Sequence, residues 1–189
     1  MEFTVFKKNE IDQINRNIIN KIGNLSFPSN STKDFVAVCK DDSCIGILKK
    51  NNEIVAVSFL DFINKDVISQ LSNHYIMIHS LSVHPKHRGK GYCKIITNKI
   101  KKKYPHTPLC LTVRTERNNP NIPGIKCYQR CGFKLIDMCH INHYDGINTY
   151  MTYHPKKHKQ SKKHKKSKRH KQSKKHKKSK RHKQSKRRK

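Results

Sequence analysis

The sequence has no apolar run of about 18 residues, the length that a membrane-spanning helix needs. It has few acidic residues. It also lacks an apolar N-terminal stretch flanked by basic residues, so we expect no membrane span and no secretory signal. Only 12 Asp and Glu stand against 43 Lys and Arg, which gives a formal net charge of +31. We therefore expect an intracellular protein, cytoplasmic or nuclear, that is attracted to polyanions.

The acidic residues are missing entirely from one end of the chain. Residues 155–189 contain 21 Lys and Arg, five His and no Asp or Glu, whereas residues 1–154 contain 22 Lys and Arg and all 12 acids. The first part has the size and charge balance of one globular domain. The second part has no aliphatic or aromatic side chain whose burial could offset the entropy of ordering, so we expect a disordered tail.

The tail repeats the sequence QSKKHKKSKRHK over residues 160–171 and 172–183. Nothing in this unit needs burying, which argues against a solenoid. Lysine and arginine at this density bind polyphosphates with an affinity that falls as salt rises. Aromatic side chains that could stack on bases are absent, so we expect non-specific binding of nucleic acid. Nuclear import and attraction to an anionic membrane surface fit the same charge.

Paired cysteine motifs are also missing. The seven cysteines form an odd set without a C-x-x-C pair, at Cys39, Cys44, Cys93, Cys110, Cys127, Cys131 and Cys139. This spacing does not indicate a zinc site, and we expect free thiols in a reduced compartment and no bound metal. Cys127 and Cys131 stand four residues apart, a spacing that suits packing on one helix face.

Hydrophobic periodicity predicts an α/β (α+β) domain with a mixed, mostly antiparallel twisted sheet flanked by helices. We expect strands at 3–8, 35–40, 44–50, 53–62, 75–83 and 109–114, and a hairpin of 133–142 and 147–153 around Asp145-Gly146. Helices are expected at 10–22, 94–104 and 124–131. Gly23 would end the first of these helices, whose inward face would carry Ile11, Ile14, Ile18, Ile19 and Ile22.

The stretch HPKHRGKGYCKI (84–95) follows the strand that ends at Val83. Gly89 and Gly91 allow tight backbone curvature, and the first amides of the next helix have no intrahelical partner. With Arg88 and Lys90 beside them, an anion such as pyrophosphate is the expected guest. A P-loop is excluded because no GK is followed by Ser or Thr, and the dinucleotide fingerprint lacks its third glycine. A basic surface turn is the alternative for this loop alone.

Two motifs resemble those of a known family. LSVHPKHRGKGYCKIITNKI (81–100) resembles the acetyl-CoA loop of the GNAT superfamily of N-acetyltransferases, in which Q/R-x-x-G-x-G/A follows a strand ending V-x-P. Arg88 and Gly91 match, whereas Cys93 stands where the family has Gly or Ala. NIPGIKCYQRCGF (121–133) resembles the family pattern N-x-x-A-I-x-L-Y-x-x-x-G-F, with Gly124 in place of Ala and Cys127 in place of Leu. Together with the order of elements, the resemblance covers about residues 1–153.

The resemblance implies a GNAT-like fold over residues 1–154 and acetyl-CoA as cosubstrate. It also implies direct attack of a primary amine, on a protein or a small molecule, in a ternary complex. A backbone N–H near Leu81 would polarise the thioester carbonyl. The cosubstrate would lie against the end of the strand, the loop and the next helix, at Leu81, Ser82, Val83, Arg88, Gly89, Lys90, Gly91, Tyr92, Cys93, Lys94 and Asn121. Asn118 or Asn119 could replace Asn121 in contacting the cosubstrate arm.

Tyr128 is the residue that the resemblance implies as general acid, giving its proton to the departing CoA thiolate. Many relatives carry a glutamate base on the strand before the loop, where this chain has Met77 and His79. Met77 cannot take a proton, but His79 can do so near neutral pH. Glu116 and a chain of water molecules are alternatives to His79.

Nucleic-acid binding without catalysis is a second function that fits this sequence. Because folds do not fix functions, a GNAT-like domain without activity could serve as a nucleic-acid-binding protein through the polybasic tail. The missing glutamate and Cys93 are the departures that keep this alternative open.

Overall fold

The computed structural model of the chain describes residues 1–26, 34–37, 40–65, 68, 71, 74–116, 119–136 and 148–155. The side chains of residues 114–120 and 148 are not described. The predicted disordered tail and the Asp145-Gly146 turn therefore lie outside the described residues. Over the rest, no helix is long and apolar enough to cross a membrane.

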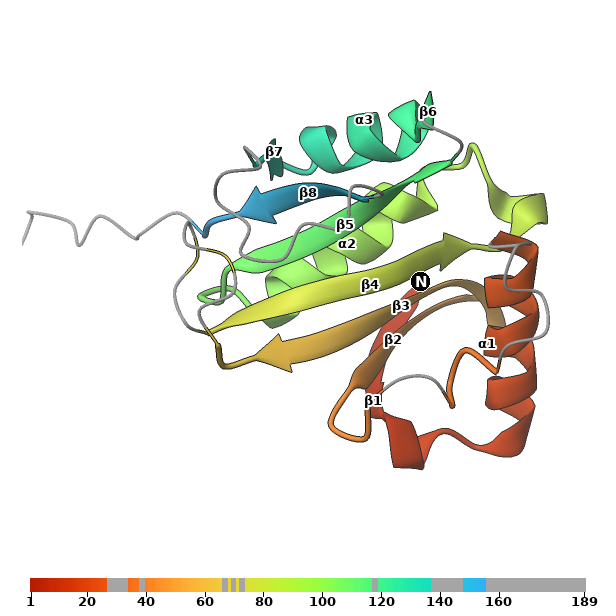
Figure 1. The fold of residues 1–189 in the computed structure, drawn as a ribbon. Helices are drawn as coiled ribbons and strands as arrows, with labels where there is room; N and C mark the ends of the chain where they lie inside the picture. The colour runs from red at the N-terminus through yellow and green to blue at the C-terminus, as the bar shows by residue number, and fades with distance from the viewer. Residues whose placement is uncertain are drawn as a thin grey trace, which may run out of the picture. The chain divides into compact units, whose positions relative to one another are not determined.

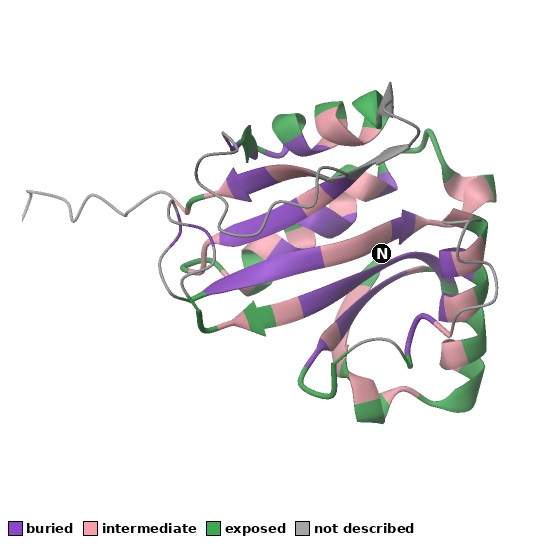
Figure 2. Ribbon diagram, viewed as in Figure 1, coloured by how far each residue is buried: buried purple, intermediate pink, exposed green. Residues whose placement is uncertain are grey.

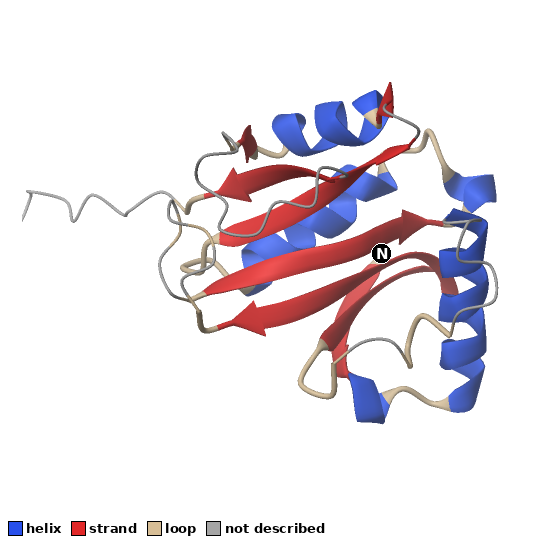
Figure 3. Cartoon of the chain, in the orientation of Figure 1, coloured by secondary structure: helices blue, strands red, loops and turns tan. Residues whose placement is uncertain are grey.

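The described chain combines one sheet with helices in an α/β arrangement (Figure 1 and Figure 3). The elements are β1 (Glu2–Lys7), η1 (Lys8–Glu10), α1 (Gln13–Ser26), β2 (Cys44–Lys50), β3 (Glu53–Ile63), β4 (Tyr75–Val83), η3 (Pro85–His87), α2 (Tyr92–Lys103), β5 (Leu109–Glu116), β6 (Asn119–Pro120), α3 (Ile122–Arg130), β7 (Lys134–Leu135) and β8 (Asn148–Tyr153).

The strands form one mixed sheet in the order β1-β2-β3-β4-β5-β8-β7, with β6 paired to β5 off this path. Neighbouring strands are antiparallel except for β4 and β5, which run parallel. This confirms the predicted mixed, mostly antiparallel sheet. The pairing of β7 with β8 confirms the part of the predicted hairpin that the structure describes.

Each face of the sheet is covered by different helices. Alternate side chains of the strands point to opposite faces, and one face packs against α2 and α3 through residues such as Ile96, Ile100 and Phe133. The opposite face packs against α1 through Ile19 and Ile22. The central strands are therefore buried on both faces (Figure 2), which explains their nearly continuous apolar sequences.

The predicted strand at 35–40 is wrong over its described part, because residues 35–37 form a turn. The carboxylate of Asp34 accepts hydrogen bonds from the backbone N–H groups of Val36 and Ala37, both at 3.0 Å. Arg16 of α1 donates to the same carboxylate at 2.6 Å. The apolar side chains of Phe35 and Val36 are buried in the cluster beneath α1, so their apolar character reflects burial at a turn.

The prediction that Gly23 ends the first helix is also wrong, since α1 continues to Ser26. A Cβ atom at Gly23 would lie 2.6 Å from a ring carbon of Phe35, so glycine is needed here for close packing. This contact fixes which face of α1 is buried. Ile19 is fully buried, whereas Ile14 is 74% exposed, which corrects its predicted inward position. Ile18 is 37% exposed and is likewise not part of the core.

Candidate active site

The parallel strands β4 and β5 separate part-way along their length. Their recorded pairing ends at Ile78 and Leu111, although β4 continues to Val83 and β5 to Glu116. Backbone groups on this edge of β4 are therefore not used by the ladder between the two strands. Such an edge can hydrogen-bond to an extended ligand.

A β-bulge lies on β4 within this separated region. Ser80 and Leu81 of β4 together oppose the single residue Ser58 of β3. Ser80 has a φ of +45°, which is rare for a residue other than glycine, and its carbonyl accepts a hydrogen bond from Ser82 Oγ at 3.2 Å. Bulges next to active sites redirect backbone and side-chain groups. The sequence gives no sign of this bulge.

The loop after β4 leads into α2 through two residues with positive φ. Gly89 has a φ of +75° and Gly91 a φ of +78°, a conformation that disfavours residues with a Cβ atom. A Cβ atom at either position would meet no atom within 4 Å, so the space before the helix is open. The first-turn amides of α2 face this space without intrahelical partners. Anions are favoured there by the helix dipole.

A pocket of about 430 Å³ occupies this space. Its walls contain many of the predicted cosubstrate residues, namely Val83, Arg88, Gly89, Gly91, Tyr92, Cys93 and Lys94. The pocket lining does not include Leu81, Ser82, Lys90 or Asn121, although all four are described. The sequence analysis missed the remaining lining residues, namely His87, Pro123, Gly124, Cys127 and Arg130. His87 belongs to η3 in the loop itself, whereas the other four lie on α3, and their place beside the loop follows only from the tertiary fold.

Two of the loop's cations have partners within the protein. Arg88 Nε donates to the carbonyl of Val83 at 3.3 Å, and its Nη2 donates to Ser26 Oγ at 3.3 Å. Arg88 therefore ties the loop to the end of α1 as well as lining the pocket. The ammonium of Lys90 donates to the carbonyl of Lys86 at 3.1 Å, a contact that braces the loop itself.

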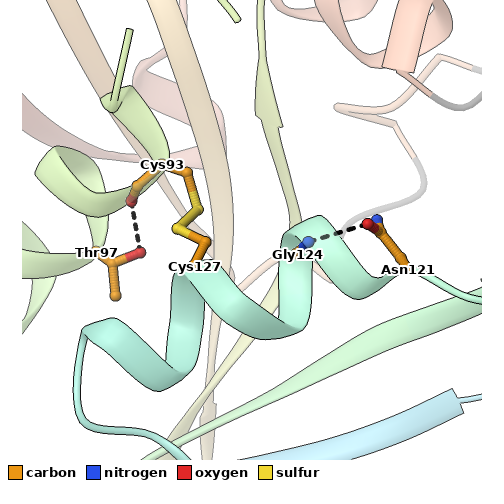
Figure 4. The surroundings of a disulfide bond; sticks show 5 residues. All are labelled: Cys93, Thr97, Asn121, Gly124 and Cys127. Atoms are coloured by element: carbon orange, nitrogen blue, oxygen red, sulfur yellow. Dashed lines mark hydrogen bonds between the residues drawn. A yellow bond between two sulfur atoms is a disulfide. The ribbon is translucent and has the colours of Figure 1, made fainter. Parts of the chain in front are cut away.

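Cys93 and Cys127 form a disulfide between the first turn of α2 and the middle of α3 (Figure 4). Their Cα atoms lie 6.8 Å apart. The expectation of free thiols is therefore wrong for these two residues. Cys44, Cys110 and Cys131 are free thiols, and Cys39 and Cys139 lie outside the described residues. The pairing could not be read from the sequence because the partners are 34 residues apart and belong to no spaced motif.

His79, the predicted base, lies at the start of the separated part of β4 and contacts a carboxylate. Its Nε2 is 3.1 Å from Asp61 Oδ2 on β3, and Ser43 Oγ donates to Asp61 Oδ1 at 2.5 Å. Burial raises the pKa of Asp61, but hydrogen bonds from His79 and Ser43 outweigh it and hold the pKa below its ordinary value. Asp61 is thus a carboxylate that can orient His79.

Comparison with known proteins identifies the family. The profile of the acetyltransferase (GNAT) family matches residues 18–133, which is more than half of the chain. The chain belongs to the GNAT family. No curated protein sequence matches it.

Several solved GNAT structures share the fold. ElaA of Escherichia coli has a TM-score of 0.56 at 16% identity, and the match covers 80% of this chain and 97% of that chain. The ribosomal-protein-S18-alanine N-acetyltransferase of Escherichia coli has a TM-score of 0.59 at 14% identity, covering 85% and 98%. An aminoglycoside 6'-N-acetyltransferase complexed with coenzyme A has a TM-score of 0.60 at 12% identity, covering 82% and 97%. At these identities the likeness shows the fold alone.

The second GNAT motif forms the start of α3. Asn121 is the N-cap of this helix, and its Oδ1 accepts a hydrogen bond from the Gly124 N–H at 3.0 Å. A Cβ atom at Gly124 would lie 3.2 Å from the Asn121 side chain, so glycine leaves room for this cap. The structure thus gives Asn121 a capping role, and its contact with the cosubstrate stays a prediction.

Tyr128, the predicted general acid, is buried on α3 next to Cys127. Its ring packs edge-on against Phe133 at 6.1 Å between centroids. Burial raises the pKa of Tyr128 well above its ordinary value, so the phenol stays protonated at neutral pH. The side chain is not part of the pocket lining.

Of the other residues considered for the site, Met77 is excluded as a base because its thioether cannot take a proton. Met77 is buried in an apolar cluster with Cys110 and Ile136. The side chains of Glu116 and Asn119, and the whole of Asn118, lie outside the described residues. Within the part of the chain that is described, no group of three or more His, Cys, Asp or Glu side chains is placed to hold a metal ion.

Proposed function

We propose that the protein is an acetyl-CoA-dependent N-acetyltransferase that acts by direct attack of a primary amine on the thioester. The observation that carries this proposal is that the pocket before α2 lies at the end of the unpaired edge of β4. The glycine-lined pocket opens before α2, and the separated edge of β4 leads from it toward His79. From Val83 to His79 this edge spans about 13 Å of strand.

The residues present suit the cosubstrate. Gly89 and Gly91 leave open space in front of the first-turn amides of α2, where a pyrophosphate would be held by N–H donors and the helix dipole. Lys94 and Arg130 place positive charge on two walls of the pocket. The pantetheine arm would then run along the free edge of β4 at Leu81, Ser82 and Val83, and the N–H near Leu81 would polarise the thioester carbonyl.

His79 would take the proton from the attacking amine. Its side chain is 42% exposed, whereas that of Asp61 is only 14% exposed, so the pair has one buried partner and one accessible partner. The carboxylate of Asp61 favours a proton on Nε2, which leaves Nδ1 as the acceptor. His79 is therefore a base with a fixed tautomer, and Asp61 is its positioning residue.

Tyr128 would return a proton to the CoA thiolate as it leaves. A phenol that is protonated at neutral pH can act as a general acid, and burial keeps Tyr128 in that form. Tyr128 belongs to the buried cluster that α3 shares with α2 and the sheet, and its chain neighbour Cys127 lines the pocket.

Acetyl transfer is tested by incubating the full chain with acetyl-CoA and a panel of primary amines. The panel includes an aminoglycoside, a peptide with N-terminal alanine, a lysine peptide and a polyamine, and mass spectrometry follows the acetylated product. We expect transfer to at least one class of amine, with the rate reduced about 100-fold or more in His79→Gln. If no amine is acetylated although acetyl-CoA binds, the catalytic part of the proposal is wrong.

A further inference from the structure

Both cysteines of the disulfide stand at positions where a pocket wall departs from the family pattern. Cys93 stands where the family has Gly or Ala, and Cys127 stands where it has Leu. The structure joins them across the two helices that line the pocket (Figure 4). The departures are therefore not independent, because together they create one covalent link.

We propose that Cys93 and Cys127 form a reversible redox site for low-molecular-weight thiols, and that the disulfide-bonded protein binds acetyl-CoA more tightly than the reduced protein. The inference rests on the proposed function, because it concerns the affinity of the same pocket for the same cosubstrate.

The disulfide is accessible to a small thiol. Both cysteines are partly exposed, and both line the pocket. The pocket walls also carry Arg88, Lys94 and Arg130. Positive charge near a cysteine favours the thiolate that leaves or attacks during exchange. The pair therefore lies in an environment that promotes thiol–disulfide exchange.

The free thiols of the described chain lie in different surroundings. Burial raises the pKa of the Cys110 thiol to about 12 and also raises the pKa values of Cys44 and Cys131. None of these three residues lines the pocket. They are consequently poor nucleophiles at neutral pH, and Cys44, which is partly exposed, offers a matched control.

The exchange balances as a two-electron reduction. The thiolate of an external thiol attacks one sulfur of the disulfide, the bond between the two sulfurs breaks, and the second cysteine leaves as a thiolate. Another external thiol then displaces the first cysteine from the mixed disulfide. The products are the two protein thiols and one external disulfide, with the two protons supplied by the external thiols.

The link controls the separation of two pocket walls. The open pocket is present in the disulfide-bonded protein, with the start of α2 tied to the middle of α3. Reduction removes this tie, so the walls can move and their side chains must be ordered when the cosubstrate binds. Ordering one or two side chains corresponds to an affinity about five- to tenfold weaker in the reduced protein.

The experiment compares acetyl-CoA binding by the full chain in its two redox states. One sample is oxidised with diamide, which takes up the two hydrogens, and the other is reduced with dithiothreitol, and each reagent is removed before calorimetry. Acetyl-CoA is the probe because it has no free thiol. Peptide mapping verifies the Cys93–Cys127 link. We expect a Kd about five- to tenfold higher after reduction. Failure of the two cysteines to link under diamide would overturn the inference.

Serine variants distinguish the effect of the disulfide on acetyl-CoA binding from the effect of each cysteine side chain. Cys93→Ser, Cys127→Ser and the double variant should all bind like the reduced protein and ignore the redox reagents. Cys44→Ser should keep the full redox response. A redox response that persists in the double variant, or equal affinity in both states of the unmodified protein, overturns this inference alone. No binding in either state overturns the proposed function, and this inference with it.

The same coupling can be measured from the effect of acetyl-CoA on the reduction of the disulfide. If the oxidised form binds acetyl-CoA more tightly, saturating acetyl-CoA must make the disulfide harder to reduce by the same factor. Reduction by graded ratios of reduced to oxidised dithiothreitol, with and without acetyl-CoA, measures this factor. An unchanged reduction midpoint would contradict the coupling.

Discussion

Nε2 of His79 lies 3.1 Å from Oδ2 of Asp61, and the other oxygen of that carboxylate accepts a hydrogen bond from Ser43. We expect Asp61→Asn to lower kcat about tenfold or more, because the amide no longer fixes the His79 tautomer. The loss should appear in kcat and leave the KM for acetyl-CoA unchanged, because Asp61 acts only through His79. Acetyl-CoA affinity, measured by calorimetry, should stay the same. A lower melting temperature with an unchanged kcat would show that Asp61 is only structural.

Tyr128→Phe should slow turnover while leaving acetyl-CoA binding intact. The ring contact with Phe133 is kept in this variant, so the melting temperature should change little. Loss of the phenolic proton should lower kcat by about 100-fold, measured at saturating acetyl-CoA. Unchanged kcat would assign the leaving-group proton to another donor.

Gly91→Ala should weaken acetyl-CoA binding about tenfold. The φ of +78° at this position disfavours a Cβ atom by about 1–2 kcal/mol, and the same Cβ would enter the space before α2 that the ligand needs. Lys102→Ala is the control, because Lys102 is exposed in the last turn of α2 and does not line the pocket. Equal losses in both variants would mean that this glycine has no special role.

The sequence predicted the parts of this fold that depend on local pattern. Apolar runs bounded by turn residues correctly predicted the strands from β2 to β5, and the helix expected at 94–104 corresponds to α2. The glycine loop was predicted because its conformation depends on the residues within it. The structure indeed places Gly89 and Gly91 at positive φ.

What the sequence could not predict depends on partners distant along the chain. Gly23 looked like a helix stop, because nothing in the pattern shows that Phe35 packs against it. The tertiary fold likewise brings Cys93 to Cys127 and Asp61 to His79. Neither pair has a characteristic spacing, so the disulfide and the contact between Asp61 and His79 could be found only from the tertiary structure.

The Asp34 turn should make stability depend on pH. Burial raises the pKa of Asp34, but hydrogen bonds from Arg16, Ala37 and Asn20 outweigh it and lower the pKa to about 2. A lowered pKa in the folded state stabilises the protein above the ordinary value of 3.8, and this stabilisation is lost as pH falls through about 2.

Asp34→Asn should therefore destabilise the protein near neutral pH by about 1 kcal/mol, a value reduced for the partial exposure of the ion pair. Denaturant titrations should show the difference from the unmodified protein shrinking between pH 3.8 and about 2. Asp41→Asn is the control, because Asp41 is fully exposed in its ion pair with Lys8. A difference that does not vary with pH would contradict the assignment to the Asp34 carboxylate.

The polybasic tail should supply salt-sensitive binding of nucleic acid. Residues 155–189 carry 21 Lys and Arg and no acid, and each phosphate that they neutralise releases counterions. Deleting these residues should abolish binding to a random-sequence duplex, measured by fluorescence anisotropy over a range of salt concentrations. Retained binding would place the nucleic-acid surface in residues 1–154 instead.

Isothermal titration of the full, disulfide-bonded chain with acetyl-CoA tests the central claim most directly. The account predicts saturable binding at one site, with the affinity reduced about tenfold in Gly91→Ala and unchanged in Lys102→Ala. The absence of binding at millimolar acetyl-CoA, or binding that Gly91→Ala leaves unaltered, would contradict it.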